Sequence, residues 1–302
     1  MSVPILLLLS AVVSLAARAF SKLCSNMVVG SSTAKYMLFY IINGGVSCVF
    51  FLVVDGFRVE LNSETFIFSL IFAALVAASL FVSLWMLKLA SISGVNILGS
   101  AFGLVLSSAM GFIAFSEEIV PIKFVRIGLM ILAALFVFLD EGRQKKDGEG
   151  KKISFRALVP LLFAVTLSAV IGCLVTLTTK LYTGSDSVAS ENSFFFWSNF
   201  ILAFGAALVF GFICIKNKGS FSNSVSLFHP KRLISLVGNT LCSNVGSIIA
   251  IWLVAQMDLS VYTPVSSAIG VIVAVIASVI FRERLGIFSY LAAAVACTAV
   301  II

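Results

Sequence analysis

The sequence predicts an all-α polytopic membrane protein whose ten transmembrane helices form a 5+5 inverted repeat. Three observations lead to this fold class: the composition, the length of the apolar runs and their repetition along the chain. Hydrophobic residues make up 61% of the 302 residues and charged residues 11%, with a mean hydropathy of +1.16. Soluble domains average about 45–50% apolar and about 25% charged residues. The composition therefore predicts a chain that lies in a bilayer.

Ten apolar runs have the length that a membrane helix needs. A helix crosses the roughly 30 Å hydrocarbon layer with about 20 apolar residues, and its backbone groups bond within their own segment. Charges, glycines and prolines separate the runs, which lie at 3–22, 36–54, 66–87, 94–115, 120–139, 157–180, 194–215, 233–256, 261–281 and 285–302. We expect each run to form one helix.

The first run also has features of a cleavable signal peptide. An apolar stretch at 5–13 is followed by Ala17-Arg18-Ala19, which is similar to a cleavage site. Signal peptides normally begin with basic residues, and none precedes this stretch. Because the first run has a counterpart in the second half of the chain, a retained helix is the stronger expectation.

Residues of the second half repeat those of the first half in the same order. Lys22 matches Lys180 in the first and sixth runs, and Asn43 matches Asn199 in the second and seventh. In the fourth and ninth runs, the matching residues are Val95, Ser100, Val105, Phe115 and Glu117 with Val261, Ser266, Val271, Phe281 and Glu283. The sequence thus predicts a five-helix repeat at 1–141, a basic linker at 142–156 and a second repeat at 157–302.

An odd number of helices in each repeat has a topological consequence. The second repeat must enter the membrane from the opposite side, so the two repeats are inverted. This architecture is common in secondary transporters, whose site lies at the midplane between the repeats. It favours transport over a purely structural role.

Two short charged turns carry a family resemblance. Residues 115–119 read Phe-Ser-Glu-Glu-Ile and residues 281–285 read Phe-Arg-Glu-Arg-Leu, each between the last two runs of its repeat. With ten runs in a 5+5 pattern, the whole chain resembles the drug/metabolite transporter superfamily, in particular its EamA-type members. The resemblance implies a basket of helices around a central cavity, with the fifth and tenth helices more peripheral, and transport by alternating access.

The carboxylates of these turns, Glu117 and Glu283, have two interpretations. A carboxylate between two helices can cap the next helix by accepting hydrogen bonds from its free N–H groups. The alternative is a role in gating or proton coupling. We keep both residues as gating or coupling candidates.

Polar residues inside the apolar runs indicate a binding site, because a buried charge in the bilayer costs at least about 2.5–3.5 kcal/mol unless it faces protein or water. The residues that we expect to bind substrate are Arg18, Lys22, Asn43, Trp85, Asn96, Lys180, Asn199, Asn244 and Tyr262. The alternative is that the lysines extend to the membrane surface and that hydroxyl groups bond to their own helix.

The carboxylates indicate the class of solute by their position. All thirteen Asp and Glu residues lie at the ends of runs or between them. The small multidrug exporters of the superfamily carry a membrane-embedded glutamate in their first helix, and this chain has no match for it. Arg18, Lys22 and Lys180 instead favour an anionic or zwitterionic solute, such as an amino acid or an organic acid.

Basic residues predict the orientation. Sixteen of the twenty Lys and Arg residues lie near the ends of the odd-numbered runs or in the loops after them. Cytoplasmic loops carry the positive excess, which places the linker 142–156 in the cytoplasm and both termini outside, in a cell (plasma) membrane. Ten-helix relatives usually keep both termini in the cytoplasm, so the charge pattern and the resemblance disagree here.

The residues favour neither an enzyme nor a cofactor-binding protein. The six cysteines lack a CxxC spacing, His229 has no clustered partners, and no GxSxG, GxxxxGK[ST] or HExxH motif occurs. We expect a secondary transporter of small metabolites without metal or cofactor, with a lipid-headgroup flippase, an exporter accessory subunit or a multidrug exporter as alternatives. Its expected partners are a small-molecule substrate and membrane lipids but no nucleic acid, with proton or other ion coupling and a homodimer as further candidates.

Overall fold

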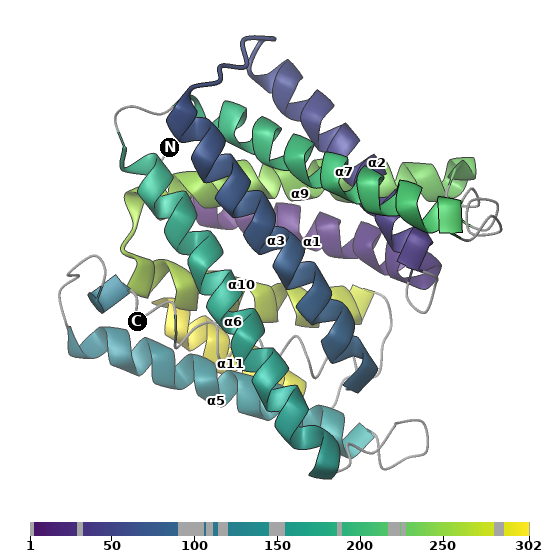
Figure 1. Cartoon of the computed structure of the whole chain (residues 1–302). Helices are drawn as coiled ribbons and strands as arrows, with labels where there is room; N and C mark the ends of the chain where they lie inside the picture. The colour runs from purple at the N-terminus through teal and green to yellow at the C-terminus, as the bar shows by residue number, and fades with distance from the viewer. Residues whose placement is uncertain are drawn as a thin grey trace. The chain divides into compact units, whose positions relative to one another are not determined.

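The structure is a computed structural model that describes residues 3–28, 33–89, 106, 111–113, 120–144, 155–185, 189–216, 224, 228–280 and 287–301. Within these residues the regular structure is helical and no strand occurs. The all-α class predicted from the composition is therefore confirmed for the described part of the chain (Figure 1).

The long helices of the described ranges coincide with nine of the ten predicted runs. They are α1 (Val3–Val28), α2 (Thr33–Val54), α3 (Ser63–Leu89), α5 (Pro121–Gln144), α6 (Phe155–Thr183), α7 (Glu191–Lys216), α9 (Pro230–Gln256), α10 (Leu259–Ile280) and α11 (Ile287–Ile301). The predicted run 94–115 lies almost entirely outside the described residues.

Four of the described helices are long and apolar enough to cross a membrane. These candidate spans are Thr33–Val54, Phe163–Thr183, Glu191–Lys216 and Arg232–Gln256. Helix α7 also exposes a continuous apolar surface, with Phe204 58%, Leu208 61% and Phe212 68% exposed. Apolar surfaces of this kind fit contact with lipid better than contact with water.

The described helices pack into two units, and each is described by itself. Unit 1 comprises Met1–Ala74 and Lys180–Trp252, and unit 2 comprises Leu75–Thr179 and Leu253–Ile302. Each unit takes residues from both halves of the sequence, and α3, α6 and α9 contribute to both units. The repeats were predicted from matching residues in the two halves of the sequence, whereas the units are defined by which helices pack together. The units therefore do not test the repeat boundaries, which stay a prediction.

Unit 1 is centred on the packing of α2 against α7. The Phe51 ring stacks on the Phe195 ring with centroids 5.1 Å apart, and Tyr182 stacks on Phe194 at 4.4 Å. Gly44 permits the close approach: a Cβ atom there would lie 2.6 Å from the Cβ of Ala203. Residues later in α2 contact residues earlier in α7, so the two helices are antiparallel.

Helix α9 packs in unit 1 against both α1 and α2. The Phe20 ring of α1 covers Gly238, and Val13 of α1 lies near Gly246. Small residues allow membrane helices to approach each other closely. This packing places the polar side chains of α9 next to those of α2.

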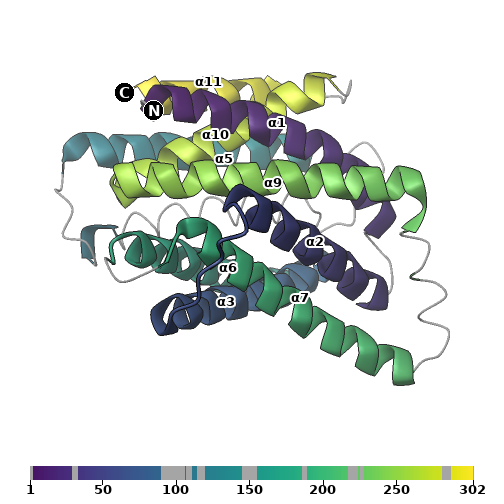
Figure 2. The same cartoon turned by 90° about the horizontal axis from the view of Figure 1, so that it is seen from above.

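Unit 2 is centred on α5, which packs against α11, with α10 beside both (Figure 2). Small buried residues make up most of the contact, namely Ala133, Ala268, Ala292 and Ala299, together with Met130. The Phe136 ring stacks on the Phe288 ring at 6.1 Å.

Candidate functional site

Two polar pairs connect α2 and α9 inside unit 1. In the first, Thr240 Oγ1 donates to Asn43 Oδ1 over 2.5 Å and also lies 2.9 Å from the carbonyl oxygen of Leu236. In the second, Ser47 Oγ donates to Asn244 Oδ1 over 3.0 Å. We call these two pairs the polar rungs.

The geometry of the polar rungs follows from helical spacing. Asn43 and Ser47 are four residues apart, as are Thr240 and Asn244, so each pair of neighbours lies on one helix face. Both rungs join residues 197 apart in the sequence. Because the later residue of α2 pairs with the later residue of α9, the two helices run in the same direction.

Three of the four rung residues are buried: Ser47 and Thr240 are each 1% exposed and Asn244 is 6% exposed, while Asn43 is half-buried. Among the described residues, Asn244 Nδ2 has no hydrogen-bond partner. An unsatisfied buried donor costs about 1–3 kcal/mol, so this amide nitrogen requires an explanation.

The structure brings together only some of the predicted site residues. Asn43 and Asn244 meet at the polar rungs. Asn199, also in unit 1, donates its Nδ2 to the carbonyl of Phe195 in its own helix at 2.8 Å. The carbonyl oxygen of Lys180 accepts from Thr183 Oγ1 and from the N–H of Gly184 at the end of α6. Tyr262 belongs to unit 2, where its side chain bonds to Ser266.

The other predicted residues cannot be placed at the site. Asn96, Glu117 and Glu283 lie outside the described residues. Arg18 and Lys22 fall in α1 and Trp85 in α3, but their side chains are outside the described part of the structure. The basic cavity expected from Arg18, Lys22 and Lys180 therefore stays a prediction.

Several hydroxyl groups in the spans bond to their own helix, as the alternative interpretation predicted. Thr176 donates to the carbonyl of Gly172, Thr179 to that of Val175 and Ser247 to that of Ser243. Each bond joins residues four apart, which is the usual arrangement for Ser and Thr in membrane helices. These side chains need no partner from another helix.

Ser47 and Thr240, the two hydroxyl partners of the polar rungs, are not among the site residues predicted from the sequence. A signal for them exists in the sequence. Asn-x-x-x-Ser at 43–47 and Thr-x-x-x-Asn at 240–244 place an amide and a hydroxyl on one helix face in two apolar runs. Such complementary pairs can satisfy each other only if the two helices are neighbours.

A second polar cluster lies at one end of unit 1, where α2 ends and α7 begins. The Asp55 carboxylate accepts from Ser190 Oγ at 3.0 Å, Ser193 Oγ at 3.0 Å and Asn192 Nδ2 at 3.3 Å. Ser193 Oγ in turn accepts from the N–H of Glu60 at 3.1 Å. This arrangement places a negative charge at the N-terminus of α7, where the helix dipole favours it.

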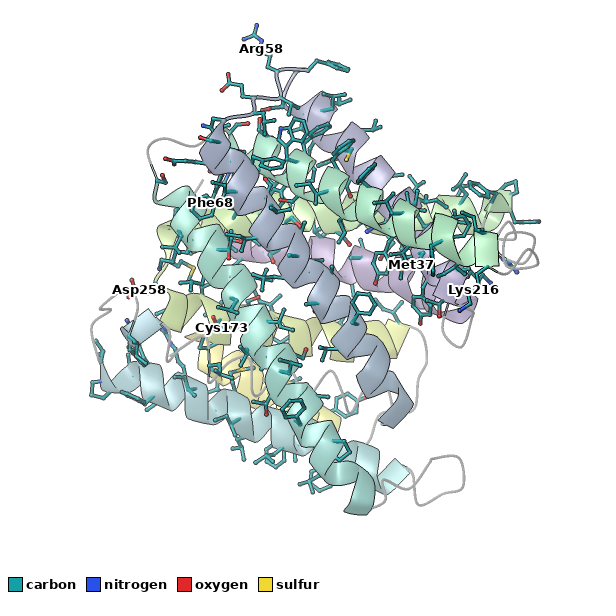
Figure 3. The ribbon with its side chains drawn as sticks, in the orientation of Figure 1. Met37, Arg58, Phe68, Cys173, Lys216 and Asp258 are labelled. Atoms are coloured by element: carbon teal, nitrogen blue, oxygen red, sulfur yellow. The ribbon has the colours of Figure 1, made fainter. Side chains whose placement is uncertain are left out.

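Two further hydrogen bonds extend this cluster. Trp197 Nε1 donates to the carbonyl oxygen of Glu60, and Tyr182 OH donates to the carbonyl oxygen of Ala189 at 2.7 Å. Arg58, at the tip of the loop after α2, is directed away from the helices (Figure 3). The cluster connects the end of α2 to α7 and leaves Arg58 at the surface.

Within the described residues, no group of three or more His, Cys, Asp or Glu side chains could hold a metal ion. Cys48, Cys173, Cys214, Cys242 and Cys297 are free thiols.

The helices and the buried polar rungs together define a helical protein with the composition of an integral membrane protein. No family model and no curated protein matches the chain. Among solved structures, 28 chains match. One of them, described only as "Crystal structure of protein", is 15% identical, with a TM-score of 0.67 over 98% of this chain and 96% of that one. This likeness shows a shared fold over nearly the whole chain and nothing about function.

Proposed function

We propose that this protein is a secondary carrier that moves a small metabolite across the membrane by alternating access, as expected for a member of the drug/metabolite transporter superfamily of the EamA type. The observation that carries the proposal is the pair of polar rungs in two candidate spans. Polar side chains are uncommon within membrane spans, where they bond neighbouring helices together or line solute and ion pathways. An enzyme that used the rung hydroxyls as nucleophiles would need an adjacent base, and none of the four rung side chains is one.

The packing of α2 against α7 supports the 5+5 inverted repeat. The two helices are the second members of their repeats, and inversion requires them to be antiparallel. Asn43 matches Asn199 in the sequence. A Cβ on its neighbour Gly44 would lie 3.1 Å from the carbonyl oxygen of Asn199. Helices related by a twofold axis cross close to equivalent residues, which is the arrangement found here.

Unit 2 supports the same repeat independently. Among its described helices, the most extensive contact joins α5 and α11, the fifth and tenth members of the proposed series. In both units, therefore, the principal contact joins equivalent members of the two repeats. One pseudo-twofold relation between the two repeats accounts for both contacts.

Helix directions support the number of spans. Since α2 and α7 are antiparallel, an even number of crossings separates them if every helix crosses once. Helices α3, α5 and α6 supply three crossings. The apolar run 94–115 is the stretch of sequence between α3 and α5 with the length to supply the fourth.

The proposed solute is small and anionic or zwitterionic, such as an amino acid or an organic acid. The support for this class is the absence of any carboxylate from the middle of the apolar runs and the basic residues Arg18, Lys22 and Lys180. Because the polar rungs are buried between helices, they favour a soluble solute over a lipid headgroup. A gradient of protons or another ion would drive the transport.

The excess of basic residues in the loops after odd-numbered runs supports a cytoplasmic linker 142–156 with both termini outside, in a plasma membrane. The Asp55 cluster follows the second run and so lies on the outer side in this orientation.

Counterflow in liposomes tests the proposal. Purified protein is reconstituted with an unlabelled amino acid or organic acid inside, and uptake of the same labelled solute is measured. A carrier gives saturable, transient accumulation that protein-free liposomes lack. Movement of a labelled lipid between leaflets without solute counterflow would instead identify a flippase, and counterflow of lipophilic cations alone a multidrug exporter.

A further inference from the structure

The amide of Asn244 is only half satisfied. Its Oδ1 accepts from Ser47 Oγ, whereas its Nδ2 has no partner, although the residue is 6% exposed in the middle of α9. Rotating the amide by 180° exchanges the two atoms but still leaves one of them without a partner. A deficit therefore exists in either orientation of the amide, and the orientation in the structure makes the free atom the donor Nδ2.

Other polar side chains in unit 1 show that the chain can satisfy such groups locally. Asn199 donates to the carbonyl of Phe195, and Ser198 donates to the carbonyl of Phe194 at 2.7 Å. Both use the carbonyl four residues earlier in their own helix. Asn244 differs because its oxygen is held by α2, which directs the amide away from its own backbone.

We propose that Asn244 selects the solute: its Nδ2 is the donor that binds an oxygen acceptor, a carboxylate or carbonyl of the transported molecule. This inference rests on the proposed function. In the state described here, closure of the second rung buries Nδ2, so the solute reaches it when α2 and α9 move apart and Ser47 releases the amide. The unsatisfied donor raises the free energy of the closed state, and binding of the solute to Nδ2 favours the open one.

The donors at the rungs are neutral. Asn43, Ser47, Thr240 and Asn244 carry no charge, so recognition at this position depends on hydrogen-bond geometry rather than on long-range attraction. Salt screens charges but has little effect on a buried neutral hydrogen bond. The share of the affinity that Asn244 supplies should therefore change little between low and physiological ionic strength.

The first test needs no ligand. The double variant Ser47→Ala/Asn244→Leu removes the unsatisfied amide together with the hydroxyl that it would leave behind. We expect its Tm in detergent to rise by about 3 °C, since an apolar pair replaces a buried donor without a partner. Ser198→Ala, at a buried hydroxyl that bonds to its own helix, is the control and should change Tm little. A lower Tm for the double variant would identify Asn244 as a structural group and overturn the proposal.

The second test uses matched probes. The common L-amino acids and short monocarboxylates are compared with the amines that lack their carboxylate, by their effect on Tm. We expect at least one carboxylate to raise the Tm of the wild type and its amine not to. This shift should be lost, with affinity at least about tenfold weaker, in Asn244→Leu and retained in Ser198→Ala.

Each other outcome contradicts the inference. It is overturned if no carboxylate shifts the wild type, if the amines act equally, or if Asn244→Leu keeps the response. Its failure is distinguishable from failure of the proposed function. If an amine shows counterflow and Asn244 plays no part in it, the proposed carrier function stands and the inference about Asn244 fails. If a carboxylate binds through Asn244 but shows no counterflow, the inference stands and the carrier function fails.

Discussion

Lys123 and Asp258 form an ion pair within unit 2, with Nζ 2.8 Å from Oδ2. The lysine side chain is 7% exposed and that of the aspartate 55%. The carbonyl of Asp258 also accepts from the N–H groups of Val261 and Tyr262, which begins α10. One residue thus starts a helix and holds the charge of Lys123 at the start of α5. In Figure 3, Asp258 lies at the edge of the molecule.

The two members of this pair should differ in their effect on stability. Asp258→Asn removes the carboxylate beside a buried ammonium group, and we expect it to lower the free energy of unfolding by about 1–3 kcal/mol. Lys123→Met removes the buried charge while keeping the apolar stem, so its cost should be smaller. Thermal or denaturant unfolding in detergent measures both. A larger loss for Lys123→Met would contradict this account.

Gly44 and its neighbour Gly45 offer a matched test of the α2–α7 contact. A Cβ at Gly44 would meet Ala203 at 2.6 Å, whereas a Cβ at Gly45 has nothing within 4 Å. We expect Gly44→Ala to lower stability by about 1–3 kcal/mol through overpacking. Gly45→Ala should be neutral or slightly stabilising, because alanine favours the helix.

A compensating substitution makes the Gly44 prediction sharper. If the Ala203 methyl group is the cause of the clash, Ala203→Gly should restore part of the stability lost in Gly44→Ala. No recovery in the double variant would mean that the two helices do not pack through these residues.

The Asp55 cluster should stabilise the end of unit 1. Asp55→Ala leaves the hydroxyls of Ser190 and Ser193 and the amide of Asn192 without their shared acceptor. We expect a lower Tm and faster proteolysis of the loop after α2, with a loss of about 1–3 kcal/mol. Arg58→Ala, in the same loop but directed outward, is the control and should unfold like the wild type (Figure 3).

The topology can be tested with two single cysteines in a chain without its six native ones. Arg58→Cys lies after the second run, and Asp147→Cys lies in the linker 142–156. Three proposed spans separate them, so a membrane-impermeant maleimide added outside cells should label position 58 and not position 147. Labelling of 147 alone would reverse the orientation. Labelling of both from one side would refute the span count.

The positions of the helices were largely predictable from the sequence. The bilayer demands about 20 apolar residues for each span, and this requirement is visible without any tertiary structure. Prolines refine the boundaries: α5 begins at Pro121 and α9 at Pro230, where the missing N–H costs nothing. Helix α1 continues to Val28, beyond the predicted end at 22, because polar residues at a helix end do not stop it.

The candidate site was predictable only in part. Asn43 and Asn244 were found because asparagine is rare within apolar runs, but their partners Ser47 and Thr240 were not. The partners are 197 residues away in the sequence, and local patterns do not report contacts at that distance. The roles proposed for Arg18, Lys22, Glu117 and Glu283 stay predictions.

Asn199 and Asn244 show most clearly what the sequence and the tertiary structure each determine. The sequence by itself determined that the chain is helical, that its helices are apolar enough for a membrane, and that both asparagines lie within them. Only the tertiary structure decided that Asn199 satisfies its amide within α7 while Asn244 gives its oxygen to α2 and leaves its nitrogen without a partner. Burial of apolar surface depends on composition along a whole segment, whereas a hydrogen bond depends on the placement of two atoms to within a few tenths of an ångström.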